Sequence, residues 1–449
     1  MPFRTALARL TLHAVAFAAL PLAFALGQIA SSAPRVHALL DLAIAPAQAP
    51  ILDPARPTAV FLVGNHGTEV SDLLPPFAAI AGSGAFNVAT VAPSRRPSPL
   101  LDANIRATGL SLVPDFTLDE FDAVFPRAPE LVVVPYIPAF DREDRALVEW
   151  LRDRAGPQTV ILTICAGTTL AAETGLMDGF RATSHFRFLA GLRLRHSGVL
   201  WQDGTRYVVD GRFVSSGALL AGVDAALAAV HRIAGEDAML RAAAAIRADA
   251  ASATDPRPLA PSPHGLRSRL HDFFGLLSGE TGLRLTDGAD EMMVAAVTDM
   301  LGVSVRTLVR SFADDPRPLR TRFGLTLVPE LVRPEPARFS TVFESVSADH
   351  GPEPAFDLVL DWIAAAQGTY PARRAGERFA YPLQPDRAGA SSGDARPLVV
   401  VALLGGLGAL GFGFTERAWR RRRAMRMPPA IPTAPGTPAP ARVVTALRP

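Results

Sequence analysis

The sequence predicts an α/β fold: a doubly wound parallel sheet followed by a second, partial α/β repeat, with membrane segments at both ends of the chain. Apolar runs of four to six residues alternate with amphipathic helical stretches through the first half, and this alternation is typical of βαβ units. The runs are apolar throughout, as expected of parallel strands that helices cover on both faces. With 449 residues, of which 49% are hydrophobic, the chain can form sizeable cores.

The predicted elements follow in order from residue 58. Strands are predicted at TAVFLVG (58–64), FNVATVAP (86–93), LSLVPDF (110–116), LVVVPYI (131–137) and TVILTIC (159–165). Helices are predicted at EVSDLLPPFAAIAG (69–82), REDRALVEWLRDRAG (142–156) and TTLAAETGL (168–176). The Asp-Gly turn in YVVDGRFVSS (207–216) predicts a hairpin, and ALLAGVDAALAAVHRIAG (218–235) predicts a closing helix.

A stretch rich in proline and serine, ASATDPRPLAPSPHG (251–265), divides the interior of the chain. It predicts a first domain over residues 57–248, a linker over 249–267 and a second unit over 268–382. Both units have a size that is usual for folded domains.

The second unit contains sequence motifs that are similar to motifs of the first. IRATGLSLVPDF (105–116) recurs as LRTRFGLTLVPEL (319–331), and GADEMMVAAVTDML (288–301) loosely matches the predicted first helix. We interpret the second unit as a partial repeat that packs against the first domain, because half of a parallel sheet is unstable alone. The chain would then be an internal pseudo-dimer or would form a homodimer. In an alternative interpretation, VSVRTLVRSF (303–312) resembles the start of the recognition helix of AraC-type DNA-binding domains.

Both ends of the chain carry apolar segments. Residues 1–33 run from arginines through an apolar stretch to small residues, which predicts either a signal peptide cleaved near Ala33 or a membrane anchor. Residues 397–414 are uncharged and rich in glycine, which favours a transmembrane helix over a buried core helix. The composition of residues 415–449 predicts a disordered tail.

Arginines flank the two apolar segments. Arg4 and Arg9 precede the first segment, and Arg417 and the run from Arg420 to Arg423 follow the second. Because arginine collects on the cytoplasmic side of membrane segments, we expect the tail in the cytoplasm of a bacterium. The globular part is then expected on the periplasmic side of the inner membrane.

The composition argues against several kinds of chemistry. The chain has no lysine, so it cannot form a lysine Schiff base, attach pyridoxal phosphate or build a P-loop. A net charge of +2 gives no reason to expect a nucleic-acid partner. The nine histidines form no His-x-x-x-His pair, and there is no Cys-x-x-Cys pair. We therefore expect no cofactor and no metal.

The chain has one cysteine, Cys165, which ends a buried apolar run and precedes a helix. Sites in doubly wound sheets lie at the carboxyl ends of the strands, so the sulfur is expected at the sheet edge on a turn like a nucleophile elbow. N–H groups at the start of the helix are expected to lower the pKa of the thiol. The alternative is a small buried hydrophobic residue without chemistry.

The segment ICAGTTLAAETGLMDGFRATSHF (164–186) closely resembles the cysteine-elbow signature of the DJ-1/PfpI superfamily, which has the class I glutamine amidotransferase-like fold. It looks most like the branch that contains isocyanide hydratases and the ligand domains of AraC-type regulators. EVSDLLPPF resembles that branch's segment after the first strand, and YVVDGRFVSSGALLAGVDAAL resembles its closing hairpin and helix. The resemblance covers about residues 57–245.

This resemblance implies that Cys165 is a nucleophile or redox-sensitive thiol, Asp72 its acidic partner and His185 an auxiliary base. A carboxyl group beside a thiol can share its proton and pass it to a substrate. From the residues alone, Asp72 is equally a capping or helix-face carboxylate, and His185 an ordinary polar-packed histidine.

The sequence departs from the family pattern at two places. Ala166 follows the cysteine, unlike in the protease-like members, which argues against peptidase activity. Tyr136 and Ile137 stand where the family usually has two glycines, and their side chains are expected to crowd the site. Tyr136, Ala166 and Gly167 are thus the expected lining of the substrate pocket.

These observations predict a membrane-anchored protein with a cysteine-centred pocket for a small-molecule ligand or substrate. The leading hypothesis is a cysteine-dependent hydratase or hydrolase that acts on a small electrophile. The alternative is a non-catalytic ligand-binding or redox-sensing module. The non-catalytic alternative is favoured if the side chain of Tyr136 fills the space over Cys165.

Overall fold

The structure, a computed structural model, describes residues 11–23, 49–138, 144–255, 258–259, 279–304, 307–345, 354–381 and 399–415, the last range without residues 400, 411 and 413. The chain divides into an α/β body within Ala25–Val399 and a terminal unit within Met1–Phe24 and Val400–Pro449. The predicted cleavage site near Ala33, the linker from residue 260 to 267 and the tail beyond residue 415 lie outside the described residues.

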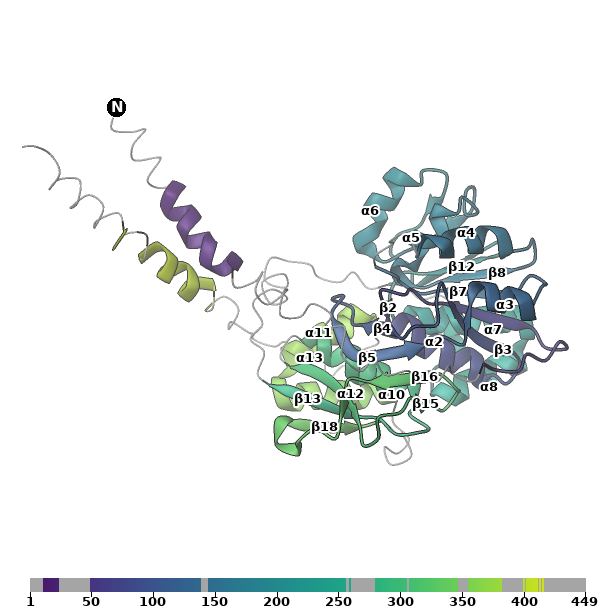
Figure 1. The fold of residues 1–449 in the computed structure, drawn as a ribbon. Coiled ribbons are helices and arrows are strands. Elements are labelled where there is room, and N and C mark those ends of the chain that lie inside the picture. Colours follow the sequence, from purple (N-terminus) through teal and green to yellow (C-terminus); the bar gives the residue numbers. More distant parts are fainter. Residues whose placement is uncertain are drawn as a thin grey trace, which may run out of the picture. The chain divides into compact units, whose positions relative to one another are not determined.

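The body is built on a seven-stranded sheet with the order β11-β12-β8-β7-β1-β3-β6 (Figure 1). All neighbouring strands are parallel except β11 and β12, which form the hairpin expected around the Asp-Gly turn. The strands are β1 (Thr58–Leu62), β3 (Asn87–Ala92), β6 (Phe116–Thr117), β7 (Leu131–Val134), β8 (Val160–Thr163), β11 (Tyr207–Asp210) and β12 (Phe213–Ser216). The predicted α/β fold with a parallel sheet is confirmed.

Helices cover the two faces of this sheet. Ala59 and Phe61 of β1 belong to one core and Val60 and Leu62 to the other, because successive side chains of a strand point to opposite faces. The first core is covered by α2 (Val70–Gly82), α7 (Ala221–Ala234) and α8 (Glu236–Ile246). The second is covered by α3 (Leu118–Val124), α4 (Arg145–Arg154) and α5 (Thr168–Glu173).

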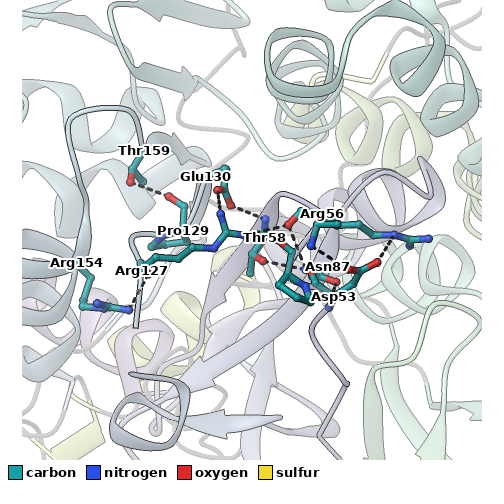
Figure 2. A network of polar contacts seen from close by, with 11 residues as sticks. Asp53, Arg56, Thr58, Asn87, Arg127, Pro129, Glu130, Arg154 and Thr159 are labelled. Carbon is teal, nitrogen blue, oxygen red and sulfur yellow. Dashed lines mark hydrogen bonds and ion pairs between the residues drawn. The ribbon is translucent and has the colours of Figure 1, made fainter. Parts of the chain in front are cut away.

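Polar side chains tie the amino ends of the parallel strands together (Figure 2). Asn87 donates through Nδ2 to the carbonyl oxygen of Asp53 at 2.7 Å and to Thr58 Oγ1 at 3.1 Å. Glu130 accepts from the backbone N–H of Thr58 at 2.8 Å and from Arg127 at 2.7 Å. These contacts stabilise the amino ends of the strands, whereas Cys165 lies at the carboxyl end of β8.

The C-terminal part of the body repeats the centre of the first sheet. Its four parallel strands have the order β17-β14-β13-β18, which corresponds to β6-β3-β1-β7 in the first sheet. The strands are β13 (Glu280–Arg284), β14 (Leu308–Ala313), β17 (Leu331–Val332) and β18 (Thr341–Glu344). The helices are α10 (Glu291–Ala295) with the π-helical turn Ala296–Met300, α11 (Leu301–Ser304), α12 (Ala355–Gln367) and α13 (Thr369–Phe379). Because residues 308–313 form strand β14, the recognition-helix alternative for this segment is wrong.

A third sheet joins the two parts of the body, with the order β15-β16-β5-β4-β2. Its strands are β2 (Thr68–Glu69), β4 (Ser98–Leu101), β5 (Ala107–Val113), β15 (Leu319–Arg320) and β16 (Thr326–Pro329). The segment 110–116, predicted as one strand of the parallel sheet, divides here between β5 and β6. Pro114 between them interrupts the ladder because proline has no N–H to donate.

The remaining elements lie around the first sheet and its neighbours. They are β9 (Arg181–Ala182), β10 (Leu200–Trp201), α6 (Phe186–Arg195), and the 3₁₀ turns Cys165–Gly167, Ala250–Ala253 and Pro336–Arg338. The turn Ala250–Ala253 falls in the predicted linker yet packs on the body, since Tyr207 donates its hydroxyl to the carbonyl oxygens of Ser252 and Ala253 at 3.1 Å and 2.8 Å.

The terminal unit contains a helix over residues 11–23 and another that includes residues 401–410. The rings of His13 and Phe412 meet edge to face at 4.9 Å between centroids. A Cβ on Gly408 would lie 2.3 Å from the carbonyl oxygen of Ala16, so glycine permits this close approach. Among the residues that the structure describes, no helix is both long enough and apolar enough to cross a bilayer.

Candidate functional site

Cys165 lies on a strained turn at the carboxyl end of β8. Its φ angle is +55°, a left-handed conformation that costs a residue other than glycine about 1–2 kcal/mol. Hydrogen bonds hold the turn in place: the Cys165 N–H donates to Ser216 Oγ at 3.1 Å, and the Cys165 carbonyl oxygen accepts from Ser184 Oγ at 3.0 Å. Backbone strain of this kind collects at functional sites, which favours a functional role for the thiol over simple packing.

Gly167 allows this turn to approach β7. A Cβ at this position would lie 2.1 Å from the carbonyl oxygen of Val134 and 2.7 Å from that of Pro135. No side chain fits in that space, so the glycine sets how closely the elbow packs on the neighbouring strand.

The thiol is buried, because the Cys165 residue is only 6% exposed. Burial raises the pKa of the Cys165 thiol well above its ordinary value, and the negative charges of Asp72 and Glu69 raise it further. The N–H of Ala166 donates to the sulfur and opposes this rise without cancelling it. The predicted lowering of the pKa by helix N–H groups is therefore wrong, since desolvation and nearby carboxylates outweigh them.

Asp72 enters the site from the first turn of α2 and is 0% exposed. Its Oδ2 accepts the backbone N–H of Tyr136 at 3.0 Å, which joins α2 to the end of β7. Burial raises the pKa of this carboxyl well above its usual range. Asp72 is therefore suited to carry a proton beside the thiol at neutral pH.

Glu69 is a second buried carboxyl group that the sequence analysis did not single out. It caps α2, because its Oε2 accepts the Asp72 N–H at 2.6 Å, and its own N–H donates to the Tyr136 carbonyl oxygen at 2.9 Å. Burial, followed by the charges of Asp299 and Asp72, raises the pKa of Glu69 well above its ordinary value. Its place three residues before Asp72 on a predicted helix start was the signal that could have identified it.

Asp299 brings a third carboxyl group from the C-terminal part of the body. It is 0% exposed, lies in the π-helical turn after α10, and its Oδ1 accepts the N–H of Ala103 at 2.7 Å. Burial raises its pKa to about 6, while hydrogen bonds from Glu69 and Ser71 oppose the rise. Sequence spacing could not have found it, because 227 residues separate it from Asp72 along the chain.

Tyr136 is half-buried beside the thiol. Burial, followed by the charges of Cys165 and Asp72, raises the pKa of its hydroxyl to about 12. Its ring meets Phe188 edge to face at 5.3 Å between centroids. Tyr136 and Phe188 both pack against the core cluster that contains Cys165.

His185 reaches the elbow through its main chain. Its N–H donates to the Cys165 carbonyl oxygen at 3.3 Å, and it begins α6 as the N-cap. Its ring lies 4.3 Å from that of Phe186 and 6.2 Å from that of Phe188, measured between centroids. The structure thus brings Asp72, Tyr136, Ala166 and Gly167 to the thiol, whereas the His185 ring accepts the Arg187 N–H at Nδ1 at 3.4 Å and contacts aromatic neighbours. In the described ranges, no group of three or more histidine, cysteine or acidic side chains is arranged to hold a metal ion.

Part of the chain is similar to known proteins. Residues 57–232 match the model of the DJ-1/PfpI family. The resemblance inferred from the sequence is confirmed. The curated isonitrile hydratase of Pseudomonas putida is 26% identical over 133 residues, which are 29% of this chain and 55% of that protein. The chain therefore spans about half the length of this curated relative.

Several solved structures are also similar to parts of the body. Drosophila melanogaster DJ-1beta is 16% identical, with a TM-score of 0.36, and the match covers 43% of this chain and 99% of that one. A ThiJ/PfpI family protein from Pseudomonas syringae is 20% identical, with a TM-score of 0.36, over 51% of this chain and 84% of that one. An AraC family transcriptional regulator from Pseudomonas putida is 14% identical, with a TM-score of 0.35, over 41% and 97%.

Proposed function

We propose that Cys165 of this chain forms a covalent bond to a small, uncharged electrophile, and that the bound electrophile is then hydrated or hydrolysed. The observation that carries the proposal is the positive φ of Cys165 on a strand-to-helix turn, with a buried carboxyl group on the facing helix. The similarity to an isonitrile hydratase supports this reaction class. An uncharged substrate is favoured because the thiol is surrounded by apolar core and carboxyl groups, both of which disfavour an anion.

The proposed reaction needs only water as a second reactant. The sulfur of Cys165 forms a bond to the electrophilic carbon, and the thiol proton passes to the substrate by way of the Asp72 carboxyl group. Water then adds to that carbon, the C–S bond breaks and a proton returns to the sulfur. The net change is addition of one water molecule, as in the conversion of an isonitrile to an N-substituted formamide.

The test is turnover by the purified full chain with a panel of aliphatic isonitriles and nitriles. We expect product with the wild-type chain and none with Cys165→Ala, because that variant lacks the atom that forms the adduct. Arg212→Ala, far from the thiol at the amino end of β12, serves as the matched control and should keep turnover. Equal turnover by the wild-type chain and Cys165→Ala would rule out the thiol mechanism.

A second candidate is a ligand-binding or redox-sensing module without turnover. The packing of Tyr136 and Phe188 against the core cluster that contains Cys165 favours it, because large side chains there leave less space for a reacting molecule. In this case no substrate of the panel is turned over, yet mild peroxide converts Cys165 to a sulfinic acid, as expected for a lone thiol without a resolving partner. Mass spectrometry of the tryptic fragment that contains Cys165 distinguishes the two candidates.

We also propose that the terminal unit holds the chain in a membrane. Large apolar side chains cover the outside of the packed helices, and the exposed ones are Leu12, Val15, Phe17, Leu20, Leu22, Leu403, Leu407, Leu410 and Phe414. Helices that are apolar on their outer surface are typical of a lipid environment, and close contacts at Gly405 and Gly408 are typical of membrane helix pairs. This packing favours retention of the N-terminal helix as an anchor over its removal as a signal peptide.

A further inference from the structure

Helix α13, the last helix of the body, ends in a closed turn. The Ala380 N–H donates to the carbonyl oxygen of Glu377 at 3.2 Å, and the Tyr381 N–H donates to that of Gly376 at 3.0 Å. This cap places Ala380 at a φ of +53°, a left-handed conformation that glycine usually supplies. An alanine adopts it at a cost, which indicates that other contacts hold the end of the helix in place.

Two donors from the first domain provide those contacts. The Leu220 N–H donates to the carbonyl oxygen of Phe379 at 3.2 Å, and Arg206 Nη1 donates to that of Ala380 at 2.5 Å. The last carbonyl groups of an α-helix have no partner within the helix, and the helix dipole favours a positive charge beside them. Leu220 and Arg206 therefore satisfy the end of α13, and Arg206 also supplies the favourable charge.

Leu220 belongs to the loop that holds the Cys165 turn. Ser216 comes directly before this loop (217–220), and its Oγ accepts the Cys165 N–H at 3.1 Å. The same hydroxyl donates to the carbonyl oxygen of Ala218 at 3.3 Å, so the position of Ala218 orients the group that bonds to Cys165. The loop 217–220 is thus bonded to the Cys165 turn through Ser216 and to the end of α13 through Leu220.

Arg206 links three elements around this loop. Its Nε donates to Asp224 Oδ2 at 2.6 Å, and Asp224 lies in the first turn of α7. Its carbonyl oxygen accepts the Gly217 N–H at 2.8 Å. The planar guanidinium makes the bonds to Asp224 and Ala380 with different nitrogen atoms, which the single nitrogen of lysine could not reproduce. The Arg206 and Asp224 side chains are only 15% and 12% exposed, so water competes little for this pair.

Apolar packing follows the same path. Phe379 is 0% exposed and belongs to one core cluster with Leu219, Leu220 and Cys165. A displacement of the end of α13 would therefore open a cavity beside the loop 217–220, in addition to breaking its hydrogen bonds.

We infer that α13 braces the Cys165 turn, and that Arg206 is the positioning residue that fastens this brace to the loop 217–220. Arg206 acts on the turn through Gly217 and Ser216. The brace keeps the turn in its strained conformation by holding the acceptor of the Cys165 N–H in place. This inference deepens the proposed function, because it names what positions the proposed nucleophile, and it rests on the Cys165 turn being the reactive site.

The experiment follows the turn in the purified full chain by hydrogen–deuterium exchange and by alkylation of Cys165 with a small neutral reagent. In Arg206→Ala we expect the peptides that contain the Cys165 and Leu220 amides to exchange about three- to tenfold faster, because the loop opens more often. Alkylation should accelerate by a similar factor at each pH. Asp72 and Glu69, whose charges raise the pKa of Cys165, stay in place, so the pH profile should keep its midpoint.

Three further variants separate the brace from other effects. Arg206→Lys keeps a positive charge at the end of α13 and should restore part of the slow exchange. Asp224→Asn keeps the bond from Arg206 to Ala380, so its turn should remain closer to the wild type than to Arg206→Ala. The matched control is Arg212→Ala. Arg212 belongs to the same hairpin and donates to the carbonyl oxygens of Ala155 and Gly156, away from the thiol, so this variant should equal the wild type.

Three outcomes would overturn the inference. The first is exchange and alkylation in Arg206→Ala that equal those of the wild type. The second is an equal acceleration of exchange throughout the body, which would indicate a general loss of stability. The third is the same acceleration in Asp224→Asn, which would assign the effect to α7 alone. If Arg206→Ala does not fold, Arg206→Gln, which keeps a donor and loses the charge, takes its place. Neither measurement needs a substrate, so the results are independent of whether the chain turns over an isonitrile.

Discussion

At the scale of single residues, the site combines a strained thiol with buried acids. Hydrogen bonds to the N–H and the carbonyl oxygen of Cys165 hold this residue at positive φ. The carboxyl group of Asp72 lies at the same end of the sheet. Both groups favour their protonated forms, because burial disfavours charge and their negative charges repel each other. The state in which both groups are ionised is therefore disfavoured, and the pair of thiol and carboxyl group tends to retain a proton.

Replacing Asp72 with Asn tests this electrostatic arrangement. The amide oxygen can still accept the Tyr136 N–H, but the negative charge that raises the pKa of Cys165 is lost. We expect the apparent pKa of the thiol to fall by about one unit and alkylation at pH 7.5 to accelerate by about tenfold. Any turnover should decrease in the same variant, because the proton carrier is gone. An alkylation profile that is unaltered by the substitution would show that Asp72 does not act on the thiol.

Glu291 provides a prediction about pH and stability. Burial raises the pKa of this carboxyl to about 7 in the folded chain, above its ordinary value of 4.5. A raised pKa means that the folded state holds the proton more tightly, so the stabilisation is complete below pH 4.5 and is lost as the pH rises through 7. The loss from this group is about 3 kcal/mol between pH 4.5 and pH 8.

Glu291→Gln resembles the protonated form and should remove that part of the pH dependence. The measurement is the free energy of unfolding in urea at pH 5 and at pH 8 for the wild-type chain and the variant. The variant should be more stable than the wild type at pH 8 and close to it at pH 5. The same difference between the two proteins at both pH values would contradict a raised pKa.

At the scale of elements, the pairing of β5 with β16 decides how the two parts of the body combine. The strand 110–116 was expected inside the parallel sheet, but the hairpin β4–β5 leaves that sheet and pairs with its counterpart from the C-terminal part. Ser311 donates its hydroxyl to the carbonyl oxygen of Gly109, which adds a side-chain contact to the ladder. A side chain at Gly109 would meet Glu330 Oε2 at 2.1 Å, so this join is closely packed.

A disulfide between β5 and β16 tests this pairing. In a Cys165→Ser background, cysteines at Leu112 and Leu327 face each other directly and should form a bond on mild oxidation, because opposed residues of antiparallel strands have suitable Cα spacing. The product should migrate as a single chain with increased mobility on a non-reducing gel. Cysteines at Leu112 and Leu325 are the control, since diagonal positions lie beyond disulfide reach. A product of two linked chains would indicate that β16 pairs between molecules.

At the scale of the whole molecule, the proposed membrane anchor predicts the orientation of the chain. Arginines before the first apolar helix and after the second favour the cytoplasm at both flanks. Reporter fusions at Pro261 and Pro449 should therefore give opposite signals, with Pro449 in the cytoplasm. In a Pro449 fusion that also lacks the four arginines from Arg420 to Arg423, the preference of the C-terminal end for the cytoplasm should be weaker. Identical compartments for the two fusions would contradict the anchored topology.

The parallel sheet, the elbow cysteine and its resemblance to the DJ-1/PfpI family could be predicted from the sequence. These features depend on local patterns: apolar runs of strand length, an Asp-Gly turn, and a cysteine between a strand and a helix. Asp72 was predicted beside Cys165 only through the resemblance to the family, because the residues alone fit a capping or helix-face carboxylate equally well. The repeat GLSLVP and GLTLVP also showed that the C-terminal part echoes the first half.

Only the tertiary structure decided the protonation of the site and the contribution of Asp299. The pKa of a thiol depends on burial and on every charge within a few ångströms, and three carboxyl groups converge here from two parts of the chain. The sequence places Asp299 in a helix far along the chain, without information on what it faces. The pairing of β5 with β16 and the packing of α10 on α2 bring Asp299 to the site, and these contacts between distant parts of the chain exist only in the folded structure.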